Sequence, residues 1–547
     1  MPRLDLRLAI PAIGCWSITW LGISSARGVL VVAILLSLGC VGGGAAALAG
    51  CTRCESGHGR RESGHGRGMA GAATIVLATA GLTGGAGIAL LIRADRVDAH
   101  PLRQLAGAAV TAVVSPIEDP KVGSRSPELV WARVRLHAVD GRSVPAATAV
   151  LFASNRPGAP SGRWLDLRVG QRARGVVTVR IPEGRGLVVA QLTARGPPTV
   201  VAEAPGYLRL AEAVRGRFRA VCADAVGHRA AGLLPGLVVG DTSMGEAEVE
   251  DQFRRAGLTH LSAVSGANFA LIVGAAVLVF AVVGGSLRTT AIAGLAATIA
   301  FAVLTQLSPS VIRAAIMGGI GLLAMAGSRS RDAMPALAAA VALALLVWPE
   351  LAVDAGFAMS VAATAALIAW SPVLRDRLVG HRWPRGAADA VAMATVAFVV
   401  TAPLVALISG RVSLTAVLAN IAVAPVIPVV TVLGALALVL AAIDVGAATA
   451  MARLLVVACE PGLWWILRVA RFLGGRWAAV PAGPLWVLLV IVAAIVGRSV
   501  LRRRSGDKYS PFDGRLVLVR IPRWLAAVRR PDLPGRDRTS RPRNHPR

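Results

Sequence analysis

GDTSMGEAEVEDQFRRAGLTHLSAVSGANFALI, residues Gly240–Ile272, is the stretch that decides how this chain folds. Its first half predicts a short amphipathic helix, Glu246–Ala256, that ends at Gly257. A polar turn follows, with three hydrogen-bonding side chains: His260, Ser262 and Ser265. Apolar residues then run without a charge until Arg288. Polar side chains at membrane depth cost free energy unless something polar faces them, so the stretch predicts a water-filled path.

The composition is that of a membrane protein. Of 547 residues, 55% are hydrophobic and 16% are charged, and the mean hydropathy is +0.64. Charged residues make up about 25% of an ordinary soluble protein. We therefore predict a polytopic α-helical membrane protein. The net charge of +28 has four possible causes: the positive-inside rule, anionic lipid, a polyanionic substrate, or an arginine-rich high-GC genome.

The chain divides into four predicted parts: residues 1–92, 93–229, 230–498 and 499–547. The first part holds three spans: Leu8–Ser24, Val29–Gly50 and Met69–Ile92. A cytoplasmic Cys/His/Arg-rich loop joins the second span to the third. The third part is a dense set of spans, about eleven or twelve with the first three. The fourth is a basic tail that we expect to be mostly disordered and cytoplasmic.

Strict alternation of these spans does not place every basic loop in the cytoplasm. Three basic segments should be cytoplasmic: Ser328–Asp332, Arg375–Arg385 and Arg498–Arg504. At least one segment must therefore be re-entrant or broken. Asn420, Pro425 and Pro428 stand in one apolar run and mark a candidate, because proline breaks a helix and frees backbone carbonyls.

Residues 93–229 have the texture of a small extracytoplasmic all-β domain. Four segments predict strands: Leu129–Val139, Thr148–Ala153, Gly175–Ile181 and Leu187–Thr193. Such short strands favour a small barrel or sandwich. Six arginines of this domain are candidates for contacting phosphate: Arg133, Arg135, Arg163, Arg168, Arg172 and Arg174. Trp131 and Trp164 offer stacking faces, although we favour core packing for both.

Arg313 is the most informative charge within the spans. It follows Pro309 in an apolar run, and a guanidinium at that depth should face a cavity or a partner. Asp354 is the candidate partner. A contact with phosphate and a structural ion pair with Asp354 both remain open.

The polar side chains of the first stretch also have two interpretations. His260, Ser262, Ser265 and Asn268 either line a substrate path or hydrogen-bond neighbouring helices together. An intramembrane serine hydrolase at Ser265 needs a histidine base, and the later histidines, His381 and His545, lie in a basic loop and the tail.

The loop between the second and third spans has a zinc-like ligand set: Cys51, Cys54, His58 and His65. Its glycine-rich duplication is unlike a compact zinc finger, so we favour a flexible loop and predict no metal and no cofactor. The chain has no Walker motif, and no nucleotide hydrolysis is predicted.

Four motifs together resemble the ComEC family of competence proteins. They occur in the family's order: AGLTHLSAVSG at Ala256–Gly266, PSVIRAA at Pro309–Ala315, GFAMS at Gly356–Ser360 and NIAVAPVIP at Asn420–Pro428. The last departs from the family, since four residues separate Asn420 from Pro425 where five or six are usual. Asn268 stands where many members have histidine.

The resemblance implies an inner-membrane channel that passes single-stranded DNA into the cytoplasm during natural transformation. It implies an oligonucleotide-binding-like (OB-like) β domain, and a path lined by His260, Ser262, Ser265, Asn268, Arg313, Asp354 and Asn420. A DNA receptor, a cytoplasmic ATPase motor and a possible homo-oligomer are the implied partners. We expect no enzymatic activity, because the family's C-terminal metallo-β-lactamase-like domain is not found. The alternative is a transporter of small molecules or lipid-linked precursors on the same scaffold.

Overall fold

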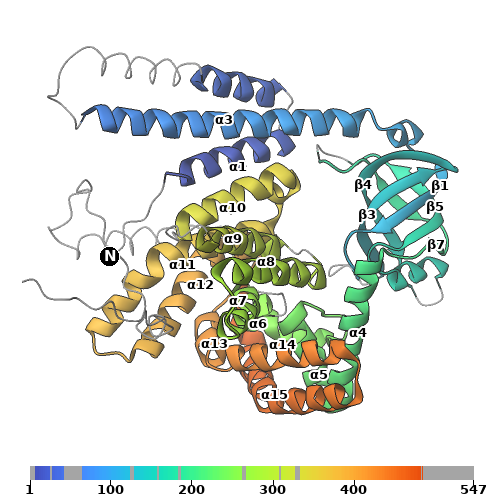
Figure 1. Ribbon diagram of the computed structural model, residues 1–547. Helices are drawn as coiled ribbons and strands as arrows, with labels where there is room; N and C mark the ends of the chain where they lie inside the picture. The colour runs from blue at the N-terminus through green and yellow to red at the C-terminus, as the bar shows by residue number, and fades with distance from the viewer. Residues whose placement is uncertain are drawn as a thin grey trace, which may run out of the picture. The chain divides into compact units, whose positions relative to one another are not determined.

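The computed structural model describes residues 7–24, 28–41, 65–122, 128–156, 159–182, 186–261, 266–306, 309–326, 333–481 and 483. A small β barrel follows the first helices, and apolar helices make up most of the remaining chain (Figure 1).

Five strands close the barrel: β1 (Ala109–Pro116), β3 (Leu129–Val139), β4 (Arg142–Ser154), β5 (Arg172–Arg180) and β6 (Gln191–Ala194). Their order is β1-β3-β4-β6-β5, and β5 pairs back with β1. β4 and β6 run parallel, while the other pairs within the barrel are antiparallel. This is the topology of an OB-like barrel, so the predicted small β domain is confirmed. β2 (Lys121–Val122) and β7 (Thr199–Ala202) extend it.

Alternation of side chains explains the barrel's core. In β3 the even-numbered residues from Val130 to Leu136 are buried, while Arg133 and Arg135 on the other face are half-buried and exposed. The prediction for β3 is confirmed residue for residue. The predicted strand Leu187–Thr193 is only partly confirmed, because β6 begins at Gln191, although Val189 N already donates to Thr148 O at 2.9 Å.

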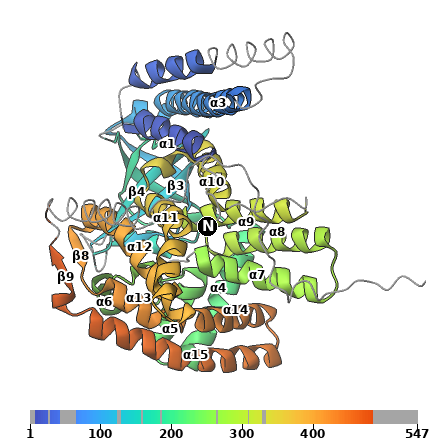
Figure 2. The ribbon, with the colours of Figure 1, turned by 90° about the vertical axis from the view of Figure 1, so that its left-hand side faces the viewer.

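The first helices pack with a later one. α1 (Ala9–Ser24), the helix Gly28–Val41 and α3 (His65–Asp98) share a core with α10 (Ala333–Val347). Figures 1 and 2 show α3 lying along α1, with α10 on the other side of α1. α3 is longer than predicted, since it includes the end of the expected loop and continues past Ile92. It ends before Pro101, because a residue preceding proline avoids helical geometry.

A second group of helices shares one large core. It contains α4 (Gly206–Ala225), α5 (His228–Val239), α6 (Ala247–Ala256), η3 (Thr259–Leu261), α7 (Gly266–Val282), α13 (Ala416–Val423), α14 (Ile427–Ile443) and α15 (Gly446–Leu473). α6 confirms the predicted amphipathic helix. α8 (Leu287–Leu304) and α9 (Pro309–Ala326) pack against α7. α11 (Ala355–Gly380) follows η4 (Pro349–Val353) and pairs with α12 (Arg385–Ser409).

α9 joins the two groups of helices. Val311 and Ala314 belong to the core of the second group, whereas Ile312 belongs to the core around α1 and α10. Successive residues of an α-helix point in directions about 100° apart, so α9 presents different faces to the two cores. Arg313 therefore lies where they meet.

Among the described residues, five helices are long and apolar enough to cross a membrane: Thr74–Asp98 within α3, α8, α11, α12 and α15. α13 and α14 form a sixth candidate, bent by 56° at a break that contains Pro425, which confirms the predicted break. Several other expected spans are apolar helices of only 10–17 residues, including Phe269–Val282 and Ser310–Leu323. The last expected span, Leu485–Gly497, lies outside the described residues. Several apolar spans define a multi-pass membrane protein.

Candidate functional site

The guanidinium of Arg313 lies between three helices. Arg313 is one turn into α9 and 7% exposed. Its Nε donates to Ser360 Oγ of α11 at 2.9 Å, and its Nη1 lies 3.6 Å from Met317 Sδ. On the third side stands Gly266, the first residue of α7, where a Cβ atom would be 2.7 Å from Nη2. Three of the four sequence motifs thus meet at one side chain.

Arg313 has no carboxylate partner within the part of the chain that the structure describes. Its contacts there are a hydroxyl and a thioether, both uncharged. A buried charge without a counter-charge costs several kcal/mol, so a cation in this position favours water or an anionic ligand beside it. Its arrangement can therefore bind an anion.

Of the two interpretations left open for Arg313, the structural ion pair with Asp354 is not found among the described residues. Asp354 is the N-cap of α11, and its Oδ1 accepts from Phe357 N at 2.7 Å. Ser360 comes six residues later, about 9 Å further along the helix, at the level that Arg313 reaches. Asp354 instead acts at longer range on Arg133 of the barrel.

Asn420 holds the end of α6 against α13. Its Nδ2 donates to Ala416 O at 2.8 Å and, more weakly, to Gly257 O at 3.5 Å. Gly257 has φ +72°, and a Cβ atom there would be 2.4 Å from Ala416 Cβ. The fourth motif therefore contacts the first, and the hydrogen bonds of Asn420 stabilise the packing between α6 and α13. Its predicted place on the substrate path stays a prediction.

The turn after Gly257 is only partly described. Thr259 and His260 are exposed, although they follow the buried Leu258. Ser262 and Ser265 lie outside the described residues, as does the side chain of Asn268. The turn reaches Gly266 and hence the guanidinium of Arg313, which keeps His260 and its neighbours as candidates for the same path.

The barrel presents most of its candidate arginines to solvent. Five are exposed: Arg135, Arg163, Arg168, Arg172 and Arg174. Ser115 and His137 share a 2.8 Å hydrogen bond on the outer face of β1 and β3. Burial lowers the pKa of His137, and the charges of Arg172 and Arg135 lower it further. These two arginines therefore belong to one basic face across β3 and β5.

Arg133 differs from the other five. Its Nε donates to Glu118 Oε1 at 2.8 Å. Burial lowers the pKa of Arg133, but Glu118, and at longer range Asp354 and Glu350, raise it above its ordinary value. Burial would likewise raise the pKa of Glu118, yet Arg133 and Lys121 hold it below its ordinary value. Arg133 is thus already neutralised by acidic groups and is less suited to phosphate than its neighbours.

The two tryptophans of the barrel do not stack on a ligand face equally well. Trp164 is 1% exposed, its Nε1 donates to Gly196 O at 3.0 Å, and it packs against Gly175, as the core-packing interpretation predicted. Trp131 is half-buried, and Lys121 Nζ lies 5.3 Å from its ring centroid. Only Trp131 keeps an accessible ring.

The described residues contain no group of three or more His, Cys, Asp or Glu side chains placed to hold a metal ion. Cys51, Cys54 and His58 lie outside the described residues, as does the side chain of His65.

Sequence reasoning did not select a second polar cluster on α4. Arg215 is 5% exposed, and its guanidinium lies 3.2 Å from Asp119 and 3.2 Å from Asp241. Arg219 also pairs with Asp241, at 2.5 Å. Burial would raise the pKa of Asp241, but Arg215, Ser243 and Arg219 hold it below its ordinary value. The cluster fixes α4 to the barrel loop and to the segment after α5.

The protein has several candidate membrane spans, an OB-like barrel and a buried arginine at which three motifs meet. It is therefore a multi-pass membrane protein with a small β domain. Residues 237–504 match the family model "Competence protein", so the chain contains the competence (ComEC) domain. The ComE operon protein 3 of Bacillus subtilis (strain 168) is 31% identical over 149 residues, which are 26% of this chain and 19% of that protein. No solved structure gives a significant match.

Proposed function

We propose that this protein is an inner-membrane channel that passes single-stranded DNA into the cytoplasm during natural transformation. The competence domain implies a role in DNA uptake. The observation that carries the finer proposal is the buried guanidinium of Arg313, which has no carboxylate partner among the described residues and contacts residues of three competence motifs. A phosphodiester is the anion that such a path would carry.

The path would also need side chains that exchange hydrogen bonds with the moving strand. His260, Ser262, Ser265 and Asn268 would supply them beside Arg313. The exposed arginines of the barrel would meet the strand's phosphates first, on the extracytoplasmic side. Transport would draw its energy from a separate ATPase and its substrate from a separate DNA receptor, and this chain would perform no hydrolysis.

The test is transformation frequency in a competent host that carries the altered chain in place of its own. Arg313→Ala should reduce transformation at least about 30-fold, because a contact with a buried charge contributes about 2–5 kcal/mol. The matched control is Arg288→Ala, which removes an exposed arginine from the start of α8. Both variants must be present in the membrane at the level of the original chain.

Normal transformation by Arg313→Ala would refute the channel. Normal transformation together with an envelope defect in a deletion strain would favour the transporter of small molecules or lipid-linked precursors.

A further inference from the structure

We infer that a cavity between the barrel, α4 and the end of α8 is a binding subsite for a phosphodiester of single-stranded DNA, placed to hand the strand from the barrel to the helices. The inference rests on the proposed function, and it adds a site that none of the four motifs contains.

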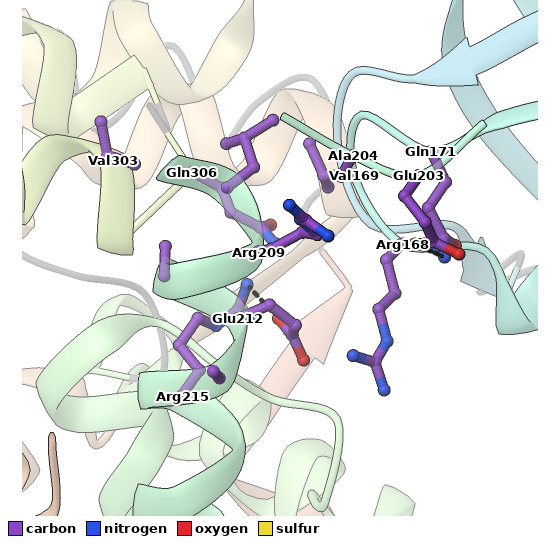
Figure 3. Close-up of a pocket in the computed structure, with 13 residues that line it drawn as sticks. Arg168, Val169, Gln171, Glu203, Ala204, Arg209, Glu212, Arg215, Val303 and Gln306 are labelled. Atoms are coloured by element: carbon purple, nitrogen blue, oxygen red, sulfur yellow. Dashed lines mark hydrogen bonds and ion pairs between the residues drawn. The ribbon is translucent and has the colours of Figure 1, made fainter. Parts of the chain in front are cut away.

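The cavity has walls from three separate segments. It has a volume of about 150 Å³, far above the roughly 10–15 Å³ that one water needs. Arg168 and Gln171 stand on the barrel side, Arg209 and Arg215 on α4, and Gln306 at the end of α8. Figure 3 shows Arg168 reaching from the barrel, and Arg209 and Glu212 from α4, around the same opening.

The barrel wall is fixed closely against α4. Gly170 has φ +83°, and a Cβ atom there would be 2.6 Å from Leu208 Cδ1 and 3.2 Å from Pro205 Cδ. Only glycine adopts this backbone conformation without strain, and only glycine leaves room for Leu208. Arg168 is therefore held at a set distance from α4 by a turn two residues away.

Among the described residues, the charges around the cavity leave two cations without acceptors. Arg215 and Arg219 share the carboxylates of Glu212 and Asp241, so that part of the wall is neutralised. Within the described ranges, the guanidinium groups of Arg168 and Arg209 have no acceptor.

Glu203 is the remaining carboxylate, and it accepts from Gln171 Nε2 at 3.1 Å. Two free guanidinium groups against one carboxylate leave a net positive site, which suits a singly charged phosphodiester.

The walls of the cavity include segments that are neighbours in sequence of the two sets of residues assigned to DNA. Arg168 precedes Arg172 and Arg174 on the basic face of the barrel, and Arg172 is paired in register with Ala202, next to Glu203. On the other side, Gln306 is only seven residues before Arg313. A DNA strand that lies on the basic face of the barrel would reach this cavity before it reaches Arg313.

A nucleic acid fits the position better than a lipid headgroup. Both free arginines come from segments that are not candidate spans, namely the barrel and α4. A headgroup site would instead draw its cations from the ends of spanning helices.

The experiment measures binding of a fluorescent single-stranded oligodeoxynucleotide to the full chain in nanodiscs of zwitterionic lipid, over a series of salt concentrations. The test variant is Arg168→Gln combined with Arg209→Gln. The control is Arg142→Gln, which removes an exposed barrel arginine that does not line the cavity. Thermal unfolding of each variant checks that it is folded.

The double variant should bind at least about fivefold more weakly than the control, and its slope of log K against log salt should be smaller by about 0.7, since the two arginines hold one phosphate and each single-strand phosphate contact contributes about 0.7. Binding equal to the control overturns the subsite, even if Arg313→Ala still abolishes transformation. Thermal unfolding is also compared between nanodiscs of zwitterionic and of anionic lipid. If the double variant loses only the stabilisation by anionic lipid and binds the oligonucleotide unchanged, the subsite is also overturned.

Discussion

Arg313 and Ser360 are joined by a 2.9 Å hydrogen bond from the guanidinium Nε to the hydroxyl Oγ, across two helices whose sequences lie 47 residues apart. Neither side chain has a carboxylate in this contact, so the hydroxyl orients the cation without cancelling its charge. Nη1 also contacts Met317 Sδ, and within the described residues Nη2 has no acceptor, so Nη2 stays available to a passing anion or to water. This relationship separates the site from an ordinary structural ion pair.

Replacing Ser360 with alanine should therefore impair uptake without removing the protein. A hydrogen bond to a charged group contributes about 1.5–3 kcal/mol, so Ser360→Ala should lower transformation roughly 10-fold or more. The matched control is Thr364→Ala, one turn further along α11, whose hydroxyl donates to Ser360 O at 2.8 Å within its own helix. Equal effects of the two changes, measured as transformation frequency per amount of membrane protein, would contradict a specific role for Ser360.

Gly266 tests the same guanidinium from the opposite side. Gly266→Ala would place a Cβ atom 2.7 Å from Arg313 Nη2, so the guanidinium must shift, which disturbs its hydrogen bond to Ser360. Transformation should fall, whereas Gly274→Ala in the same helix, with no atom within 4 Å of the new Cβ, should have no effect. Because Gly266→Ala acts through Arg313, adding it to Arg313→Ala should cause no further loss. A further loss in the double variant would show that Gly266 has another role.

The sequence was sufficient to predict the elements whose buried and exposed side chains differ strongly in polarity. β3 alternates over eleven residues, so its bounds could be predicted from polarity alone. β1 was missed because its outward residues Ala109, Thr111 and Val113 contrast little in polarity with its buried ones. Helix α6 was predicted because its charges and its final glycine mark both the exposed face and the end.

The candidate site could be predicted only in part. Arg313 was evident as a charge within an apolar run, but its partner depends on how far α9 and α11 slide past each other, which no local pattern specifies. Asp354 seemed suitable by charge, yet its carboxylate is used by the backbone of its own helix. The cavity beside Arg168 was not predictable for the same reason, since its walls come from three segments that only the folded chain brings together.

Gly257 should be essential for joining α6 to α13. Gly257→Ala meets both a positive φ and a contact of 2.4 Å with Ala416 Cβ, so it should lower the free energy of unfolding by more than the roughly 1 kcal/mol that strained backbone alone costs. Gly410→Ala is the control, because Gly410 has φ +67° and no atom near the added Cβ. The difference between the two in thermal unfolding of the purified protein measures the packing contact. If both variants unfold alike, the contact with Ala416 contributes nothing.

The polar cluster on α4, in which Arg215 and Arg219 pair with Asp241, should make the stability of the fold depend on pH. Asp241 has a pKa below its ordinary value, so its stabilising effect is complete above the unfolded pKa of about 3.9 and is lost as the pH falls through the folded value. Asp241→Asn should lower the unfolding temperature by roughly 5–10 °C at pH 7, since it removes one partner of a buried charge cluster. The difference from the original chain should shrink below about pH 4, where the carboxylate becomes protonated in the unfolded chain before it does in the folded one. Asp224→Asn removes an exposed partner of Arg453 and should change little at any pH. A difference for Asp241→Asn that stays constant down to pH 3 would mean that its charge does not stabilise the fold.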